Sequence, residues 1–165
     1  MLQPVVRRTW APQGETPVLD CWDRHDRLSV ISALAVSPQR RRLGLSFDIF
    51  DHNIITEDVV EFAAQLVRRL GKITLVWDRW QVHRSAARQL KARFGRRIHI
   101  EWLPAYAPEL NPTEYVWGHT KSADLANFVP DDTLHLGQSI AGSLRHTRQN
   151  QSLLRSFFQH AQLAI

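Results

Sequence analysis

The chain has 165 residues, which is enough for one compact domain with a hydrophobic core and too few for two domains of ordinary size. Its hydrophobic share of 44% and charged share of 22% are typical of globular proteins and exclude an intrinsically disordered chain. It carries 21 basic and 16 acidic residues, and most of the basic ones are arginines. Arginine suits a polyanionic partner, but a net charge of +5 is equally compatible with an ordinary surface.

Composition also excludes several kinds of site. The single cysteine, Cys21, forms neither an intramolecular disulfide nor a Cys-x-x-Cys zinc knuckle. The 8 histidines occur at no metal-ligand spacing, so we do not expect zinc. The first residues form no apolar signal region, and no stretch approaches the roughly 18 apolar residues of a membrane span. We therefore expect a cytoplasmic protein that does not bind a membrane.

The first part of the chain predicts a loop followed by a β-hairpin. Residues 1–27 contain several turn-forming prolines and glycines and predict an opening loop or short hairpin. Leu28–Val36 is a mostly apolar run with β-branched residues and predicts a strand. A turn at Arg40–Arg42 leads to Leu43–Phe50, where alternating apolar residues predict the second strand.

Helices then alternate with short apolar strands. Thr56, followed by two acidic residues, predicts the N-cap of a helix that continues to Leu70, and Gly71 is a typical helix-ending residue. Ile73–Trp77 is almost wholly apolar, which predicts a strand buried on both faces. A second amphipathic helix is expected over about Ser85–Phe94.

The rest of the chain completes an α/β pattern. Ile98–Leu103 predicts a strand, a proline-rich loop leads to a helix near Thr113, and Asp132–Ile165 predicts two helices that break near Thr147–Asn150. Alternating helices and strands predict one mixed sheet with helices on its faces. We divide the single domain 1–165 into the opening segment 1–27, an α/β core 28–121 and a helical tail 122–165.

Asp78 directly follows the apolar strand Ile73–Trp77. Ligands in α/β sheets bind beyond the carboxyl ends of strands, so this position makes Asp78 a candidate site residue. Alternatively, its carboxylate caps the next helix or pairs with Arg79 or Arg84. The position alone does not decide between these roles.

Glu114 has a similar alternative. In Asn111-Pro112-Thr113-Glu114, Asn111 is a good N-cap, Pro112 suits the first helical position, and Glu114 is placed to reach back to the Asn111 amide. This capping role would account for the residue. A side chain in the first turn also points back toward the strand ends, so a role in a site remains open.

Two motifs contain these acids. The first is Val76-Trp77-Asp78-x4-His83, and the second is Trp102-Leu103-Pro104-x-Tyr106-x-Pro108-x-Leu110-Asn111-Pro112-x-Glu114-Tyr115-x-Trp117. Together with the upstream segment 8–17 and the tail, they resemble the DDE transposases of bacterial insertion sequences in the mariner superfamily. The resemblance covers nearly the whole chain, and the second motif is long and specific.

This resemblance implies an RNase H-like fold, divalent metal chemistry, and DNA strand cleavage followed by strand transfer. Asp78 matches the second catalytic carboxylate and Glu114 the third, and both are expected to bind Mg²⁺ or Mn²⁺. Carboxylates are hard ligands for such ions, which activate an attacking water or 3′-hydroxyl and stabilise the leaving oxygen. DNA is the expected partner, and the protein would associate with the nucleoid when bound to it.

The resemblance also indicates three candidate DNA contacts. His83 matches a family histidine, and Arg79 stands where many relatives have asparagine and would add a phosphate-binding charge. Lys121 lies seven residues after Glu114, on the same face of a straight helix. As alternatives, His83 is a capping or surface residue and Lys121 a solvated charge. The tryptophans at 77, 102 and 117 are expected in the core.

The first catalytic aspartate of the family has no counterpart. Its strand precedes the Arg-Thr-Trp-Ala-Pro segment, and no acidic residue precedes Trp10 in this sequence. Four other aspartates do not lie at the position that corresponds to this first catalytic aspartate: Asp20, Asp23, Asp48 and Asp51. We expect the family's central strand to be missing between the strand 28–36 and the strand 73–77, which leaves unpaired backbone groups on both.

Two functions remain open for a chain without this strand. The first is metal-dependent DNA cleavage and strand transfer, with the missing carboxylate supplied by self-association or by an upstream transposase half. The second is a non-catalytic DNA-binding remnant or domesticated module. An unrelated RNase H-like nuclease is disfavoured, because the proline-rich motif before Glu114 is that of the transposases.

Overall fold

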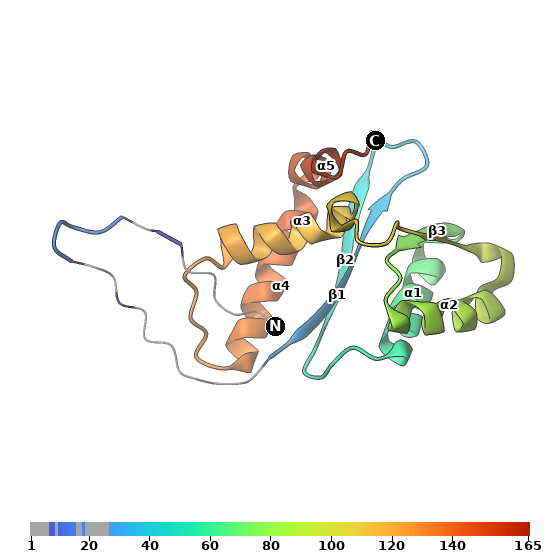
Figure 1. The fold of residues 1–165 in the computed structure, drawn as a ribbon, viewed down its shortest axis with the longest axis horizontal. Helices are drawn as coiled ribbons and strands as arrows, with labels where there is room; N and C mark the ends of the chain where they lie inside the picture. Colours follow the sequence, from blue (N-terminus) through green and yellow to red (C-terminus); the bar gives the residue numbers. More distant parts are fainter. Residues whose placement is uncertain (1–6, 9, 16–17, 19–26) are drawn as a thin grey trace.

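The computed structural model describes residues 7–8, 10–15, 18 and 27–165 (Figure 1). Most of the expected opening segment 1–27, with Asp20, Cys21 and Asp23, lies outside the described residues. Within them, four strands and five α-helices follow one another in the order that the sequence predicts. None of the described helices is both long enough and apolar enough to cross a membrane.

A β-hairpin forms the first sheet. Strands β1 (Ser29–Val36) and β2 (Leu43–Phe50) pair antiparallel, with Ser29 opposite Phe50 and Val36 opposite Leu43. The Ser37 amide donates to the Arg42 carbonyl at 2.9 Å, and Arg40 adopts a positive φ of 55° in the turn. The predicted hairpin and its arginine turn are therefore confirmed.

Three helices pack on this hairpin: α3 (Pro112–His119), α4 (Thr133–Gln149) and α5 (Gln151–His160) (Figure 1). Asn150 separates the last two, because its side chain accepts the Leu153 amide at 3.0 Å and so caps α5. The predicted break is confirmed. Hairpin and helices share one core, formed by Leu28, Leu43, Leu45, Val116, Leu136, Ile140, Leu144, Leu154, Phe157 and Phe158.

The remaining elements form a second half: α1 (Thr56–Leu70), β3 (Ile73–Trp77), α2 (Gln81–Phe94) and β4 (Ile98–Trp102). Strands β3 and β4 pair in parallel, with Trp77 opposite Trp102. This half has its own core, formed by Val59, Val60, Ala63, Val67, Trp77, Ala86, Ala87, Leu90, Ile98 and Ile100. The hairpin thus packs mainly with the tail helices, although Ile31 of β1 also packs against this second core.

Two helix starts differ from expectation. The amide of Ile55 donates to the Asp58 carboxylate at 2.9 Å, so Ile55 is the N-cap of α1 and Thr56 is its first helical residue. Helix α2 begins at Gln81, ahead of the expected Ser85. The amide of its N-cap residue, Trp80, donates to the Asp78 carboxylate at 2.9 Å.

The two sheets are not joined to each other within the described residues. Strand β1 pairs only with β2, and β3 only with β4. A groove of about 1220 Å³ separates them, lined by most of β1 and all of β3. Thr74 and Val76 on β3 are exposed, so the prediction that this strand is buried on both faces was wrong. The groove lies between β1 and β3.

Candidate active site

Asp78 stands at the carboxyl end of β3, at the edge of the groove. One oxygen of its carboxylate accepts the Trp80 amide at 2.9 Å and the His83 Nδ1 proton at 2.7 Å. Its other oxygen has no hydrogen-bond partner among the described residues, and the side chain is 54% exposed. Asp78 therefore starts helix α2 and still presents a free oxygen to the groove. The alternative pairing with Arg79 or Arg84 is not found.

His83 is held in place by aromatic contacts. Its ring stacks on Trp77, with centroids 4.7 Å apart and planes 6° from parallel, and meets the edge of Trp80 at 5.3 Å. The side chain is only 18% exposed, so His83 is not a free surface residue. Its fixed ring directs Nδ1 toward Asp78, and His83 therefore orients that carboxylate.

Glu114 lies in the first turn of α3 and also lines the groove. The predicted cap is confirmed in part, because the Asn111 side chain accepts the Thr113 amide at 3.1 Å. The predicted return contact from Glu114 to the Asn111 amide was wrong, because that amide instead donates to Pro108 at 2.9 Å. Within the described residues the Glu114 carboxylate has no hydrogen bond or ion pair, so it is available to a ligand.

The groove thus brings Asp78, His83 and Glu114 to one surface, although 36 positions separate the two acids. The free carboxylate oxygens are the hard donors that Mg²⁺ and Mn²⁺ prefer, so they fit such an ion as part of its coordination shell. No group of three or more His, Cys, Asp or Glu side chains in the described part of the chain is arranged to hold a metal. Asp78 and Glu114 thus both line the groove, and their role as metal ligands stays a prediction.

The two candidate cationic contacts differ in position. Arg79 is exposed next to Asp78. Lys121 lies in a π-helical turn, Thr120–Asp124, that follows the end of α3 at His119, and it does not line the groove. Its contact with DNA stays a prediction.

A basic stripe on α2 was missed at the level of sequence. Arg84, Arg88 and Lys91 follow at spacings of four and three residues, lie on one exposed face and form no ion pair within the described residues. Arg93, on the same helix, is instead paired with Glu61 at 3.6 Å. Helix α2 contains no acidic residue. The helical spacing of these cations was the signal that would have found the stripe.

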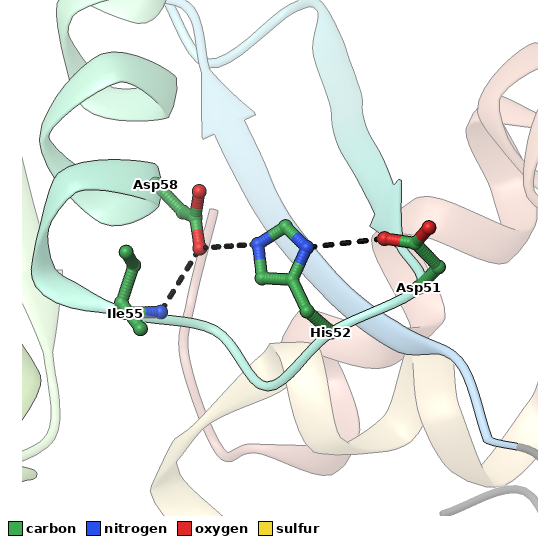
Figure 2. Close-up of polar contacts among 4 residues, drawn as sticks. All are labelled: Asp51, His52, Ile55 and Asp58. Carbon is green, nitrogen blue, oxygen red and sulfur yellow. Dashed lines mark hydrogen bonds and ion pairs between the residues drawn. The ribbon is translucent and has the colours of Figure 1, made fainter.

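A second cluster of titratable groups joins the end of β2 to α1 (Figure 2), and none of its titratable residues lines the groove. His52 lies between two carboxylates, with Nδ1 3.1 Å from Asp51 and Nε2 3.1 Å from Asp58. The hydrogen bond to Asp51, followed by the one to Asp58, raises the pKa of His52. Asp58 also accepts the Ile55 amide, so this cluster fixes the start of α1 and has a structural role.

The aspartates that the sequence set aside remain outside the candidate site. Asp48 is partly buried on β2, and loss of solvent raises its pKa. Neither Asp48 nor Asp51 lines the groove. Neither of these two described acids therefore takes the place of the first catalytic carboxylate that the resemblance implies.

Comparison with known proteins now identifies the family. A family model described as DDE superfamily endonuclease matches residues 1–134, which include both motifs. The chain belongs to this family. No curated protein sequence matches this endonuclease-family chain. The resemblance seen in the two motifs is thus confirmed, whereas the roles of individual residues stay predictions.

The fold of this DDE endonuclease chain also has a solved counterpart. It is similar to the crystal structure of the Mos1 strand transfer complex, with a TM-score of 0.60 and 10% sequence identity. The match covers 98% of this chain and 47% of the other, so the chain spans about half the length of that protein. This likeness confirms the expected RNase H-like α/β fold.

Proposed function

We propose that this chain binds DNA and takes part in metal-dependent DNA strand cleavage and strand transfer, with Asp78 and Glu114 as ligands of Mg²⁺ or Mn²⁺. The observation that carries the proposal is the placement of both acids on one groove, each with free carboxylate oxygens. Membership of the DDE endonucleases supports the same chemistry. Nuclease activity requires clustered hard ligands, and these residues supply two of them.

The chain's own residues have distinct roles in this proposal. Bound divalent ions supply activation of the attacking oxygen and stabilisation of the leaving oxygen. The His83 ring and the Trp80 amide fix one oxygen of Asp78, which leaves the other directed to a ligand. Glu114 reaches the same groove from α3 without any competing contact in the described chain. Arg79 adds a positive charge next to Asp78 for a DNA phosphate.

The basic stripe of Arg84, Arg88 and Lys91 is the proposed DNA-binding surface. It begins a few residues after Asp78, so a DNA backbone held along α2 would pass close to the carboxyl end of β3. Unpaired arginines and lysines bind phosphate by charge and release counterions in doing so. This surface gives affinity without sequence selection, because contacts with phosphates carry no base information.

A nicking assay on supercoiled plasmid tests the catalytic proposal. The purified chain should convert the plasmid to the open circular form with Mg²⁺ or Mn²⁺, and not with EDTA. Asp78→Asn and Glu114→Gln should each abolish the reaction, because both changes keep the side-chain shape and remove the charge. Glu57→Gln is the matched control, since Glu57 is also an exposed acid in the first turn of a helix but does not line the groove.

A non-catalytic DNA-binding module is the second candidate, and one observation favours it. The described residues bring together only two carboxylates and no third metal ligand. Under this alternative the protein retards labelled DNA in a gel, shows no metal-dependent nicking, and binds Mn²⁺ no better than Asp78→Asn does in calorimetry. Nicking that survives both acid substitutions would instead indicate a contaminating nuclease and contradict the proposed site.

A further inference from the structure

The loop between β4 and α3 leaves the sheet at the edge where Asp78 lies. Trp77 is opposite Trp102 in the parallel pair of β3 and β4, so the two strands end together. The Leu103 amide donates to the Trp77 carbonyl at 2.9 Å, and Asp78 follows Trp77 directly. Leu103 and Leu110, near the two ends of the loop, line the same groove as Asp78. The loop is therefore attached beside the candidate site.

Hydrogen bonds hold the second half of this loop. It contains a short 3₁₀ turn, Pro108–Leu110, and the Asn111 amide donates to the Pro108 carbonyl at 2.9 Å. The Tyr115 hydroxyl donates to the Glu109 carbonyl at 3.2 Å and so ties the turn to α3. Two prolines in the loop fix φ at further positions. The loop therefore has a defined shape and holds the residues of its first half in one place.

Tyr106, in the first half of the loop, adopts a conformation that its packing does not explain. Its φ of 57° lies in the left-handed region, which residues with a Cβ atom rarely adopt. Its side chain is wholly exposed, with a relative exposure of 102%, so the ring adds nothing to the packing of the described residues. A strained backbone of this kind is characteristic of functional sites. The exposed ring is therefore available to a ligand outside the chain.

The residues after β3 indicate the chemistry of that ligand. Arg79 is exposed beside Asp78, and Trp80 is 48% exposed and lines the groove. A positive charge close to exposed aromatic rings is the combination that binds single-stranded nucleic acid, because the charge holds the backbone and the rings stack on bases. In a paired duplex, neighbouring bases cover both faces of each base. Only an unpaired base can therefore stack on Tyr106.

We propose that Tyr106 is a stacking contact for an unpaired base of the DNA strand that lies at Asp78, and that it makes the chain prefer DNA with an unpaired end over fully paired DNA. The inference rests on the proposed function, because a strand reaches Tyr106 only if DNA binds near Asp78. The contact itself needs no metal ion, so EDTA does not abolish it. The ring carries the contact and the hydroxyl does not, since stacking uses the face of the π system.

Fluorescence anisotropy in EDTA tests this preference with two labelled duplexes of equal length, one fully paired and one with mismatched bases at one end. The original chain should bind the mismatched duplex at least about fivefold more tightly, the lower end of what one stacked base contributes. Tyr106→Ala should lose this preference, and Tyr106→Phe should keep it. Leu134→Ala is the matched control, since Leu134 is also an exposed apolar side chain but does not line the groove, and it should keep the preference. A preference that survives in Tyr106→Ala would overturn the inference.

Two further measurements separate stacking from a structural role of the ring. The fluorescence of 2-aminopurine at the unpaired position should fall when the original chain or Tyr106→Phe binds, and much less when Tyr106→Ala binds, whereas equal quenching by all three would overturn the inference. Tyr106→Gly removes the ring and suits a positive φ, so its Tm should be unchanged or higher while the preference for mismatched DNA is lost. A lower Tm would show that the ring supports the fold and would contradict the inference.

The inference and the proposed function fail in different ways. Equal affinity of the original chain for both duplexes would contradict the stacking contact and leave the proposed function in place, whereas no binding of either duplex would contradict both. A mismatch preference that depends on Tyr106, in a chain that does not nick DNA, would support the contact and contradict the catalytic proposal. A dimer in analytical ultracentrifugation that Tyr106→Ala dissociates would show that the ring contacts a second chain, and would overturn the inference.

Discussion

Removal of the His83 ring should lower stability by an amount that the contacts of the ring define. His83→Ala removes the stack on Trp77, the edge contact with Trp80 and the hydrogen bond to Asp78. Aromatic contacts are worth about 0.5 to 1.5 kcal/mol beyond buried area, and a hydrogen bond about 0.5 to 1.5 kcal/mol net. The contribution of this hydrogen bond lies at the lower end of its range, because water reaches the half-exposed Asp78 carboxylate and replaces the lost donor.

The expected loss is therefore roughly 1 to 3 kcal/mol in the free energy of unfolding. In a chain of this size, each 1 kcal/mol lowers Tm by about 2 to 4 °C, so thermal unfolding followed by circular dichroism should shift by roughly 2 to 12 °C. His99→Ala is the matched control, since His99 also contacts a carboxylate, Glu101 at 2.6 Å, but both side chains are exposed. That change should stay within about 0.5 kcal/mol.

Two further variants separate packing from orientation of the carboxylate. His83→Phe keeps a ring against Trp77 and should recover most of the stability, but it has no proton to donate to Asp78. Mn²⁺ affinity measured by calorimetry should therefore fall in the phenylalanine variant as it does in the alanine variant. The reasoning is refuted if His83→Ala is as stable as His99→Ala, or if His83→Phe restores both stability and metal affinity.

Three other predictions follow from the same structure. The pKa of His52 is raised, so the contacts of its ring with two aspartates are fully stabilising below the ordinary histidine pKa of 6.5 and are lost as pH rises through the higher pKa of the folded state. The Tm of the original chain should therefore exceed that of His52→Gln by less as pH rises. Ile100→Val and Ile140→Val change two different cores, and each should lower the free energy of unfolding in urea by about 0.5 to 1.5 kcal/mol. The loss in the double variant should equal the sum of the two single losses within about 0.5 kcal/mol. Arg84→Ala and Arg88→Ala should each weaken DNA binding and reduce the slope of log K against log salt concentration by about 0.9 per lost phosphate contact. Unchanged slopes would show that α2 does not bind DNA.

Local patterns were sufficient where neighbours in sequence decide the structure. Alternation and turn residues predicted the hairpin 29–50, and Asn150 marked the break between the last two helices because capping is a contact within one turn. The start of α2 was placed too late, because the contact of the Asp78 carboxylate with the Trp80 amide, just before the helix, was not foreseen. The π turn that contains Lys121 was not foreseen, because nothing local distinguished it from a continued helix.

Local patterns also could not predict the geometry of the candidate site, because it depends on contacts between different elements. The two motifs indicated Asp78 and Glu114 as site residues, but the sequence was also compatible with a capping box as the role of Glu114. Only the folded loop, in which Pro108 takes the Asn111 amide, leaves the Glu114 carboxylate free. The importance of His83 was likewise underestimated, because its aromatic neighbours Trp77 and Trp80 act together only once β3 and α2 are in place.

The sequence by itself determined the elements, their order and the family motifs that contain Asp78 and Glu114, because periodicity, caps and motif spacing are properties of neighbouring residues. Tertiary structure alone decided that the apolar residues divide into two cores with a groove between them. The physical reason is that strand pairing depends on edges meeting across the whole chain. Among the described residues β1 pairs only with β2 and β3 only with β4, and Asp78 and Glu114 both line the groove between the two sheets.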